Sequence, residues 1–202
     1  MTEPEQPWPE RVRAAFTEAL GEVPVEEGFG PVSVDVPAES WPDAVRLSWE
    51  ELGCTFFDWL SAVDEADQGF RLVCHLARHR PGGVDHLLVR TLLPRGSAAV
   101  ASVADVFRGA RWHERETHEM FGVDFTEDGR VLELAPLLLP EEFEGHPLRK
   151  EFVLASRVVK AWPGAKEPGE SEAAAPSRRR TRAPGVPQPG EWGPHPPGGA
   201  DG

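Results

Sequence analysis

Three apolar runs separated by two short turns constrain the fold of this chain more than any other feature. The runs are residues 55–63, 70–78 and 84–93, and the turns are residues 67–69 and 80–83. In the second run Leu72, Cys74 and Leu76 alternate with other residues, which is the period of a strand. Short turns that contain Gly join antiparallel neighbours. The pattern predicts three consecutive strands of one antiparallel sheet.

Helical signals flank these strands. Val12 and Phe16 fall on one face of a helix expected over residues 9–20. We also expect helices over residues 39–52, 102–107 and 111–121. The short helix at 102–107 would begin with a capping box formed by Ser102 and Asp105.

The order of the elements sets the fold class. Val32, Val34 and Val36 alternate with polar residues, which predicts a further strand with one buried face. Helix, strand, helix, several strands and helix in this order indicate an α+β fold. We expect a single domain over residues 7–158, with helices packed on a mixed or antiparallel sheet. A tail rich in Pro and Gly follows over residues 159–202, expected to be extended or disordered, or to lie along a partner.

Charge and cysteine content exclude several functions. The net charge of −13 repels nucleic acid and anionic lipid, so neither is expected as a direct ligand. No run approaches the roughly 20 apolar residues of a membrane span, and the N-terminus lacks a secretory signal. Cys54 and Cys74 have no metal-ligand spacing and are too few for an iron–sulfur cluster. We expect a cytoplasmic protein with two reduced, structural thiols.

Two clusters of charged residues, 112–122 and 140–152, bracket the apolar run 132–139. Charge this dense, interleaved with aromatic side chains, suits a surface that meets another protein. Two interpretations of the first cluster stay open. It is either a solvated helix with ion pairs such as Arg115 with Glu119, or a fixed network that pairs partly buried charges with backbone or partner groups.

The second cluster contains a turn. Gly145 permits a backbone conformation that other residues resist, and Pro147 holds the preceding residue extended. Such a turn presents His146, Arg149 and Lys150 beside several carboxylates. A solvated turn and a protein-binding surface both fit this pattern.

Metal and catalytic chemistry find little support in the residue spacing. His113 and His118 are five residues apart and point about 140° away from each other on a helix, whereas zinc proteases place two His at i and i+4. We therefore expect no catalytic residue, metal ligand or cofactor-binding residue in this chain. A metal-dependent hydrolase that uses Glu114 and His118 stays as an alternative.

The two clusters together resemble a known family. Residues 112–122, followed by 138–140 and 144–150, closely resemble the 30 kDa subunit of the proton-pumping NADH–quinone oxidoreductase, respiratory complex I. Residues 61–64 match more weakly. The resemblance implies a peripheral-arm subunit on the cytoplasmic side of the cell membrane that itself binds no cofactor. FMN, iron–sulfur clusters, NADH and quinone would be held elsewhere in the complex.

In such a complex the implied role is structural. The chain would support electron transfer from NADH to quinone, coupled to proton translocation, by docking the quinone-site (49 kDa-type) subunit beside other peripheral-arm subunits. The implied partner-interface residues are those of the two motifs: Glu114, Arg115, Glu116, Met120, Phe121, Gly122, Pro140, Glu144, Gly145, His146, Pro147, Leu148, Arg149 and Lys150.

The resemblance has departures and rivals. Residues 126–129 and 134–136 differ from the family pattern, which carries Gly-His-Pro and arginines there. This difference indicates either a diverged paralogue or a partner surface that lacks one basic contact. The homologous subunit of an energy-converting, membrane-bound hydrogenase is an alternative, because related chains serve both complexes.

Overall fold

The computed structural model describes residues 6–140 and 143–153. It has three α-helices in these ranges: α1 (Trp8–Leu20), α2 (Trp41–Glu50) and α3 (Ala110–Phe121). A five-stranded sheet has the strand order β1-β2-β5-β4-β3, and a three-stranded sheet the order β6-β7-β8. The predicted α+β class with a mixed sheet is confirmed. The predicted tail and the domain boundary at residue 158 lie outside the described residues.

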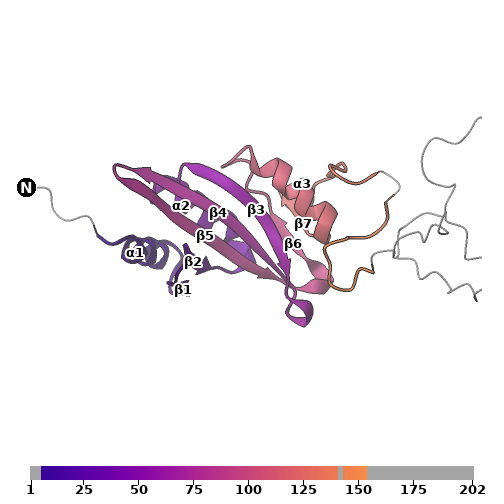
Figure 1. Ribbon diagram of the computed structural model, residues 1–202, viewed down its shortest axis with the longest axis horizontal. Coiled ribbons are helices and arrows are strands. Elements are labelled where there is room, and N and C mark those ends of the chain that lie inside the picture. The colour runs from indigo at the N-terminus through magenta and orange to yellow at the C-terminus, as the bar shows by residue number, and fades with distance from the viewer. Residues whose placement is uncertain (1–5, 141–142, 154–202) are drawn as a thin grey trace, which may run out of the picture.

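The predicted central hairpins form. β3 (Phe56–Asp64), β4 (Phe70–Arg80) and β5 (Gly83–Leu93) are antiparallel neighbours, with Cys74 opposite both Leu60 and Val89. These residues share the face of the sheet that is buried under the helices. In Figure 1, α1 and β1 (Val25–Glu26) lie at one end of this long sheet and α3 lies at the other.

The strand expected at residues 32–36 forms as β2 (Val32–Asp35), but both of its faces are covered. Val34 is fully buried as expected, yet Ser33 on the opposite face is only 6% exposed. The prediction of one buried face was wrong because β2 is an inner strand: it pairs with β1 on one side and, in parallel, with β5 on the other. On the face opposite Val34, the Arg90 side chain of β5 binds both Asp35 of β2 and Glu26 of β1 and so lies across the strand.

No helix forms at residues 102–107, so that prediction was wrong. The Ser102 hydroxyl accepts the Ala104 N–H at 3.2 Å and donates to the Glu114 carboxylate at 2.9 Å, which holds a turn. Asp105 pairs with Arg46 on α2 instead of completing a capping box.

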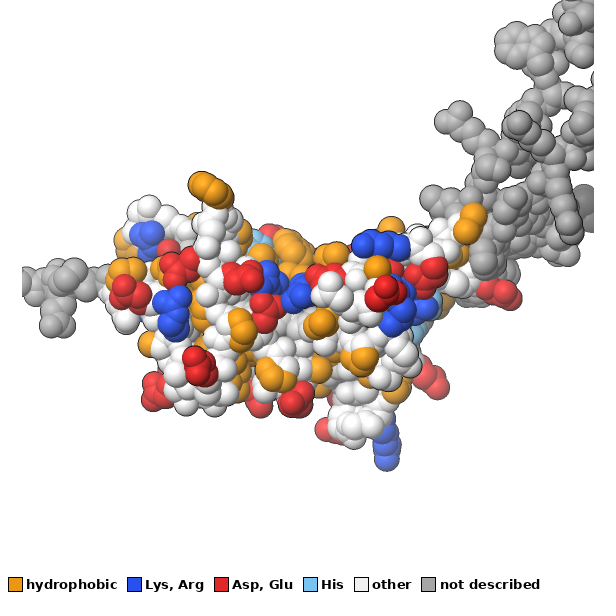
Figure 2. Space-filling model, turned by 90° about the horizontal axis from the view of Figure 1, so that it is seen from below, with side chains coloured by type: hydrophobic (Ala, Val, Ile, Leu, Met, Phe, Trp, Pro, Cys, Tyr) orange, Lys and Arg blue, Asp and Glu red, His pale blue; other side chains and the backbone are white. Residues whose placement is uncertain are grey.

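A second sheet was not expected from the sequence. β6 (Ala99–Ala101) pairs in parallel with β7 (Asp124–Glu127), and β8 (Arg130–Val131) closes a hairpin on β7. α3 connects β6 to β7, so the helix packs between this small sheet and β3. Charged side chains of both signs follow one another across the face shown in Figure 2, and apolar side chains are scattered among them.

Candidate functional site

The carboxylate of Glu114 is the buried centre of the first charged cluster. Its residue has no exposed surface, and its carboxylate accepts hydrogen bonds from Ser102 Oγ at 2.9 Å and from the Val103 N–H at 2.8 Å. Burial raises the pKa of Glu114, and these two hydrogen bonds only partly oppose the shift. Glu114 therefore belongs to a fixed network that ties α3 to the turn before it.

Arg115 and Glu119 hold a loop against α3. Arg115 donates to the carbonyl oxygens of residues 135 and 136 at 3.0 and 2.8 Å. The Glu119 carboxylate accepts the backbone N–H groups of three successive residues, Leu137, Leu138 and Leu139, at 3.1, 2.9 and 2.8 Å. The interpretation as an Arg115–Glu119 ion pair is thus wrong, because each charge binds backbone groups of the loop instead.

The second charged cluster caps the C-terminal end of α3. His146 Nδ1 lies 2.9 Å from Glu119 O, the Leu148 N–H donates to Met120 O at 3.1 Å, and Arg149 Nε donates to Phe121 O at 2.6 Å. The last carbonyls of a helix have no partner within the helix, and a cation is favourable there. We call these three contacts the α3 joint.

Gly122 allows the α3 joint to close. Its φ of 71° and ψ of 34° place it in the left-handed region that ends many helices. A Cβ at Gly122 would overlap Arg149 Nη2 and lie 2.5 Å from His146 Nε2. Burial lowers the pKa of His146, which keeps the imidazole neutral at this packed site.

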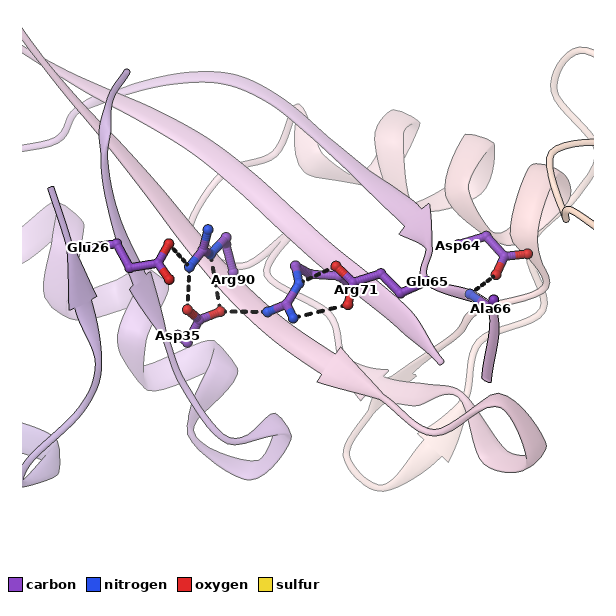
Figure 3. Close-up of polar contacts among 7 residues, drawn as sticks. All are labelled: Glu26, Asp35, Asp64, Glu65, Ala66, Arg71 and Arg90. Atoms are coloured by element: carbon purple, nitrogen blue, oxygen red, sulfur yellow. Dashed lines mark hydrogen bonds and ion pairs between the residues drawn. The ribbon is translucent and has the colours of Figure 1, made fainter. Parts of the chain in front are cut away.

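Asp64 ties the same segment to the sheet. Its side chain is 2% exposed and accepts the N–H groups of Lys150 and Ala66, both at 2.8 Å (Figure 3 shows the second). Arg95 pairs with Asp64 and, at 3.0 Å, with Glu151. Burial alone would raise the pKa of Asp64, but these hydrogen bonds and the Arg95 charge outweigh it and lower the pKa. The sequence indicated Asp64 only weakly, did not indicate Arg95, and indicated Glu119 only as an ion-pair partner of Arg115.

The remaining predicted interface residues separate into two groups. Met120 and Phe121 are buried in the core, and Gly145 has the positive φ of 95° that its turn requires. The exposed group consists of Pro140, Glu144, Leu148 and Lys150, with Glu116 and Pro147 half-buried beside them. No hydrogen bond or ion pair joins the Glu116 or Glu144 side chain to another described residue.

A chain of ion pairs crosses the face of the five-stranded sheet that lies opposite the helix-covered face. Arg90 pairs with Glu26 at 2.7 Å and with Asp35, and Arg71 pairs with Asp35 at 2.7 Å and with Glu65 at 2.6 Å (Figure 3). The Arg71 bond lowers the pKa of Glu65. These pairs join β1, β2, β4 and β5. All of them except the Arg90–Glu26 pair are between half-buried side chains.

His113 and His118 do not meet, as their spacing predicted. His113 Nδ1 lies 3.4 Å from the Leu60 N of β3, whereas His118 Nδ1 lies 3.0 Å from Val123 O. Among the described residues, no three His, Cys, Asp or Glu side chains are grouped to hold a metal ion. Cys54 and Cys74 are both buried and unpaired. No helix in the described part of the chain has the length and apolar character to cross a membrane.

The fold and these contacts define an α+β protein in which several charged motif residues hold the chain's own backbone in place. Other motif residues are exposed on the surface that this backbone forms. A family model narrows this class. The chain belongs to the family of the respiratory-chain NADH dehydrogenase 30 Kd subunit, whose model matches residues 34–158. The resemblance carried by the two motifs is thereby confirmed.

The chain is similar to individual proteins and to a chain in a solved structure. The C subunit of NADH-quinone oxidoreductase from Roseiflexus castenholzii is 34% identical over 157 residues, which cover 74% of this chain and 84% of the relative. The C subunit of F(420)H(2) dehydrogenase from Methanosarcina mazei is 33% identical over 152 residues, covering 71% of this chain and 88% of the relative. A chain in the structure of the membrane-bound sulfane sulfur reductase, an archaeal respiratory membrane complex, has a TM-score of 0.48 and 28% identity, covering 59% of this chain and 69% of that one.

Proposed function

We propose that this chain is a non-redox structural subunit in the peripheral arm of an NADH–quinone oxidoreductase, where it docks the quinone-site subunit. It thereby supports electron transfer from NADH to quinone coupled to proton translocation. One observation carries this proposal. The segment that contains the family motif is bonded to α3 at residues 135–139 and 146–149 and to the sheet at Asp64.

This arrangement suits a docking surface because it is ordered before the partner arrives. Residues 132–153 contain no helix or strand in their described part, so their backbone lacks the hydrogen bonds of regular structure. Ordering such a segment during association costs conformational entropy and weakens binding. Arg115, Glu119, Asp64 and the α3 joint supply that order within the free chain, which leaves the exposed motif side chains for the partner.

The proposal assigns the redox chemistry to other polypeptides. FMN, iron–sulfur clusters, NADH and quinone would be bound elsewhere in the assembly, and this chain would associate with the cytoplasmic side of the cell membrane through its partners. What supports this view is that Glu114, Arg115 and Arg149 bind backbone groups of this same chain. Such groups are occupied in holding the fold.

Co-purification tests the proposal. A tagged full-length chain, recovered from mildly solubilised membranes, should bring the quinone-site subunit and further peripheral-arm subunits with it. Recovery of the wild-type chain alone would refute the proposal. The exposed Lys150 gives a variant test: Lys150→Glu should reduce recovery of the partners, while the free energy of unfolding changes by no more than about 0.5 kcal/mol.

Arg130→Glu is the matched control for Lys150→Glu, because Arg130 is equally exposed but lies on the β7–β8 hairpin. The control should keep normal recovery of the partners. Equal loss in both variants would mean that the net charge of the chain, and not its motif surface, decides association.

A second candidate function is that of the corresponding structural subunit in a related complex that uses another electron donor. The similarity to a subunit named for F(420)H(2) dehydrogenase supports this candidate. The co-purified subunits discriminate: a nicotinamide-binding subunit supports the first candidate, and nickel-site cysteines in the partner would support the hydrogenase alternative. Stoichiometric zinc or iron in the purified chain would instead revive the metal-dependent hydrolase.

A further inference from the structure

The loop that α3 holds presents apolar side chains to solvent. Leu138 is 60% exposed and Trp112, on the first turn of α3, is also 60% exposed. The Arg115 guanidinium lies 5.3 Å from the centre of the Trp112 ring and donates to the loop carbonyls, so it joins the two. We call this apolar area the loop surface; it consists of Trp112, Ala135, Pro136, Leu138 and Pro140.

The loop surface is unusual for an irregular segment because several of its backbone groups already form hydrogen bonds with side chains of α3. The N–H groups of residues 137–139 all bind Glu119, and the carbonyls of residues 135 and 136 bind Arg115. A loop normally stays on the surface because its unpaired backbone groups need water. With these groups satisfied, a partner can cover the loop and exclude water without leaving them unpaired.

A hollow of about 180 Å³ opens between the loop and α3. Leu134, Leu139 and Phe143 line it together with His118 and His146. A dry apolar cavity of about 150 Å³ can hold a benzene ring, so this hollow has room for one large apolar side chain. Binding energy at protein interfaces concentrates in such pockets, where one anchor side chain is fully covered.

The charges around this area indicate what kind of partner fits. Glu133 precedes the hollow-lining Leu134, Glu144 lies between the lining residues 143 and 145, and Glu116 is on α3 beside Arg115. Arg115 itself is engaged with the loop carbonyls. The rim is therefore acidic, which repels anionic lipid and the identical rim of a second copy.

We infer that the loop surface is a dry docking site for an apolar face of a partner subunit, which inserts one large apolar side chain into the hollow and surrounds it with Lys or Arg. The inference rests on the proposed function, since it names the chemistry of the partner that the docking surface accepts. It assigns the contact to residues 134–140, Phe143 and Trp112, and most of these residues lie outside the predicted interface set.

Leu138 gives the test, with tagged full-length chain recovered from mildly solubilised membranes. Leu138→Glu should lower the recovery of partner subunits at least about tenfold, as removal of an interface anchor does. Leu138→Met, which keeps the apolar volume, should keep near-normal recovery. Because Leu138 is largely exposed, the melting temperature of each purified variant should stay within about 2 °C of wild type.

Phe29→Glu is the matched control. Phe29 is a fully exposed apolar residue in the loop before β2, outside the loop surface and outside the lining of the hollow. The control should leave recovery of the partners unchanged. An equal loss in Phe29→Glu and Leu138→Glu would overturn the inference, because association would then respond to any added surface charge.

The outcomes separate this inference from the proposed function. Wild-type chain recovered without any partner refutes the proposed function. Wild-type chain recovered with its partners, together with unchanged recovery of Leu138→Glu, refutes only the docking site. A dimer of the purified chain that dissociates in Leu138→Glu would overturn the assigned occupant, because a second copy would then cover the loop surface.

Discussion

Gly122 offers the sharpest test of the α3 joint, because both its backbone and its surroundings exclude a side chain. In Gly122→Ala the new Cβ would overlap Arg149 and lie 2.5 Å from His146 Nε2. Moving these side chains away breaks the hydrogen bonds to Phe121 O and Glu119 O. A hydrogen bond from a charged group contributes about 1.5–3 kcal/mol and a neutral one about 0.5–1.5 kcal/mol. The expected loss is about 2–4.5 kcal/mol beyond the backbone strain.

Gly129→Ala isolates this loss from the strain. Gly129 has a φ of 73°, close to the 71° of Gly122, and nothing lies within 4 Å of a Cβ added there. Both variants incur the left-handed strain of about 1–2 kcal/mol. In urea unfolding of the purified chain, Gly122→Ala should therefore be about 2–4.5 kcal/mol less stable than Gly129→Ala at an unchanged m value.

Melting temperatures provide an independent measurement. A loss of 1 kcal/mol lowers the melting temperature of a chain of this size by about 2–4 °C, so the two Ala variants should differ by about 4–18 °C. Equal stability of the two variants would show that Arg149 and His146 move aside without cost. The reasoning that the motif caps α3 would then be refuted.

Three further predictions concern buried ionisable groups. Because burial raises the pKa of Glu114, the stability that Glu114 contributes should fall as pH rises from its unfolded pKa of about 4.3 through its folded pKa. In urea unfolding across pH, the wild type should therefore lose stability relative to Glu114→Gln over this range, and profiles of the same shape would contradict the prediction. Asp64 has a lowered pKa, so the stability it contributes is present above its unfolded pKa of about 3.9 and is lost as pH falls through the folded pKa. Asp64→Asn should cost about 3 kcal/mol near pH 7 and remove that acid-side loss. Burial raises the pKa of the Cys54 thiol to about 12 and also raises the pKa of the Cys74 thiol. A thiolate-specific reagent at about pH 8 should therefore label neither cysteine in the folded chain and both cysteines in denaturant. Rapid labelling of the folded chain would mean that the core opens.

The parts of the fold that the sequence predicted depend on local signals. The hairpins β3–β4 and β4–β5 have alternating apolar residues and short turns, and α3 ends at a glycine, so each is specified within one stretch of chain. β6 and β7 are three and four residues long and pair across the whole of α3. Strands this short carry too few residues for a period, and their pairing depends on a contact distant in the sequence.

The helix expected at residues 102–107 failed for a related reason. Ser102 has the chemistry of a helix cap, but its hydroxyl binds the carboxylate of Glu114, which lies 12 residues further along the chain. An unpaired buried charge costs several kcal/mol, which is more than a cap contributes to a short helix. The hydrogen bond to Glu114 therefore determines the conformation at Ser102, in place of the local helix propensity.

The candidate site shows the same limit. A fixed network of charged α3 residues was one of two interpretations that the sequence left open, and the sequence singled out Gly145, His146 and Arg149. Asp64 was indicated only weakly, Arg95 was missed, and Glu119 was assigned the wrong partner, because their partners are 86, 56 and 18–20 residues away in the sequence. Contacts of that span are set by the fold and leave no spacing pattern to read.

The α3 joint and the loop contacts also explain which residues of this chain can differ from the family pattern without loss of these contacts. Residues 126–129 belong to the β7–β8 hairpin and its turn, and no hydrogen bond of the α3 joint or of the Glu119 loop uses them. Residues 135 and 136 bind Arg115 through their carbonyl oxygens, which every amino acid supplies, but their side chains also belong to the loop surface and line the hollow. Side-chain identity can therefore change over residues 126–129 without breaking the α3 joint or the Glu119 contacts, whereas Gly122, Arg149 and Glu119 act through features that few other residues provide. A chain that exchanges the residues 126–129 for a different turn should keep its partners, and loss of the partners would place those residues in the interface.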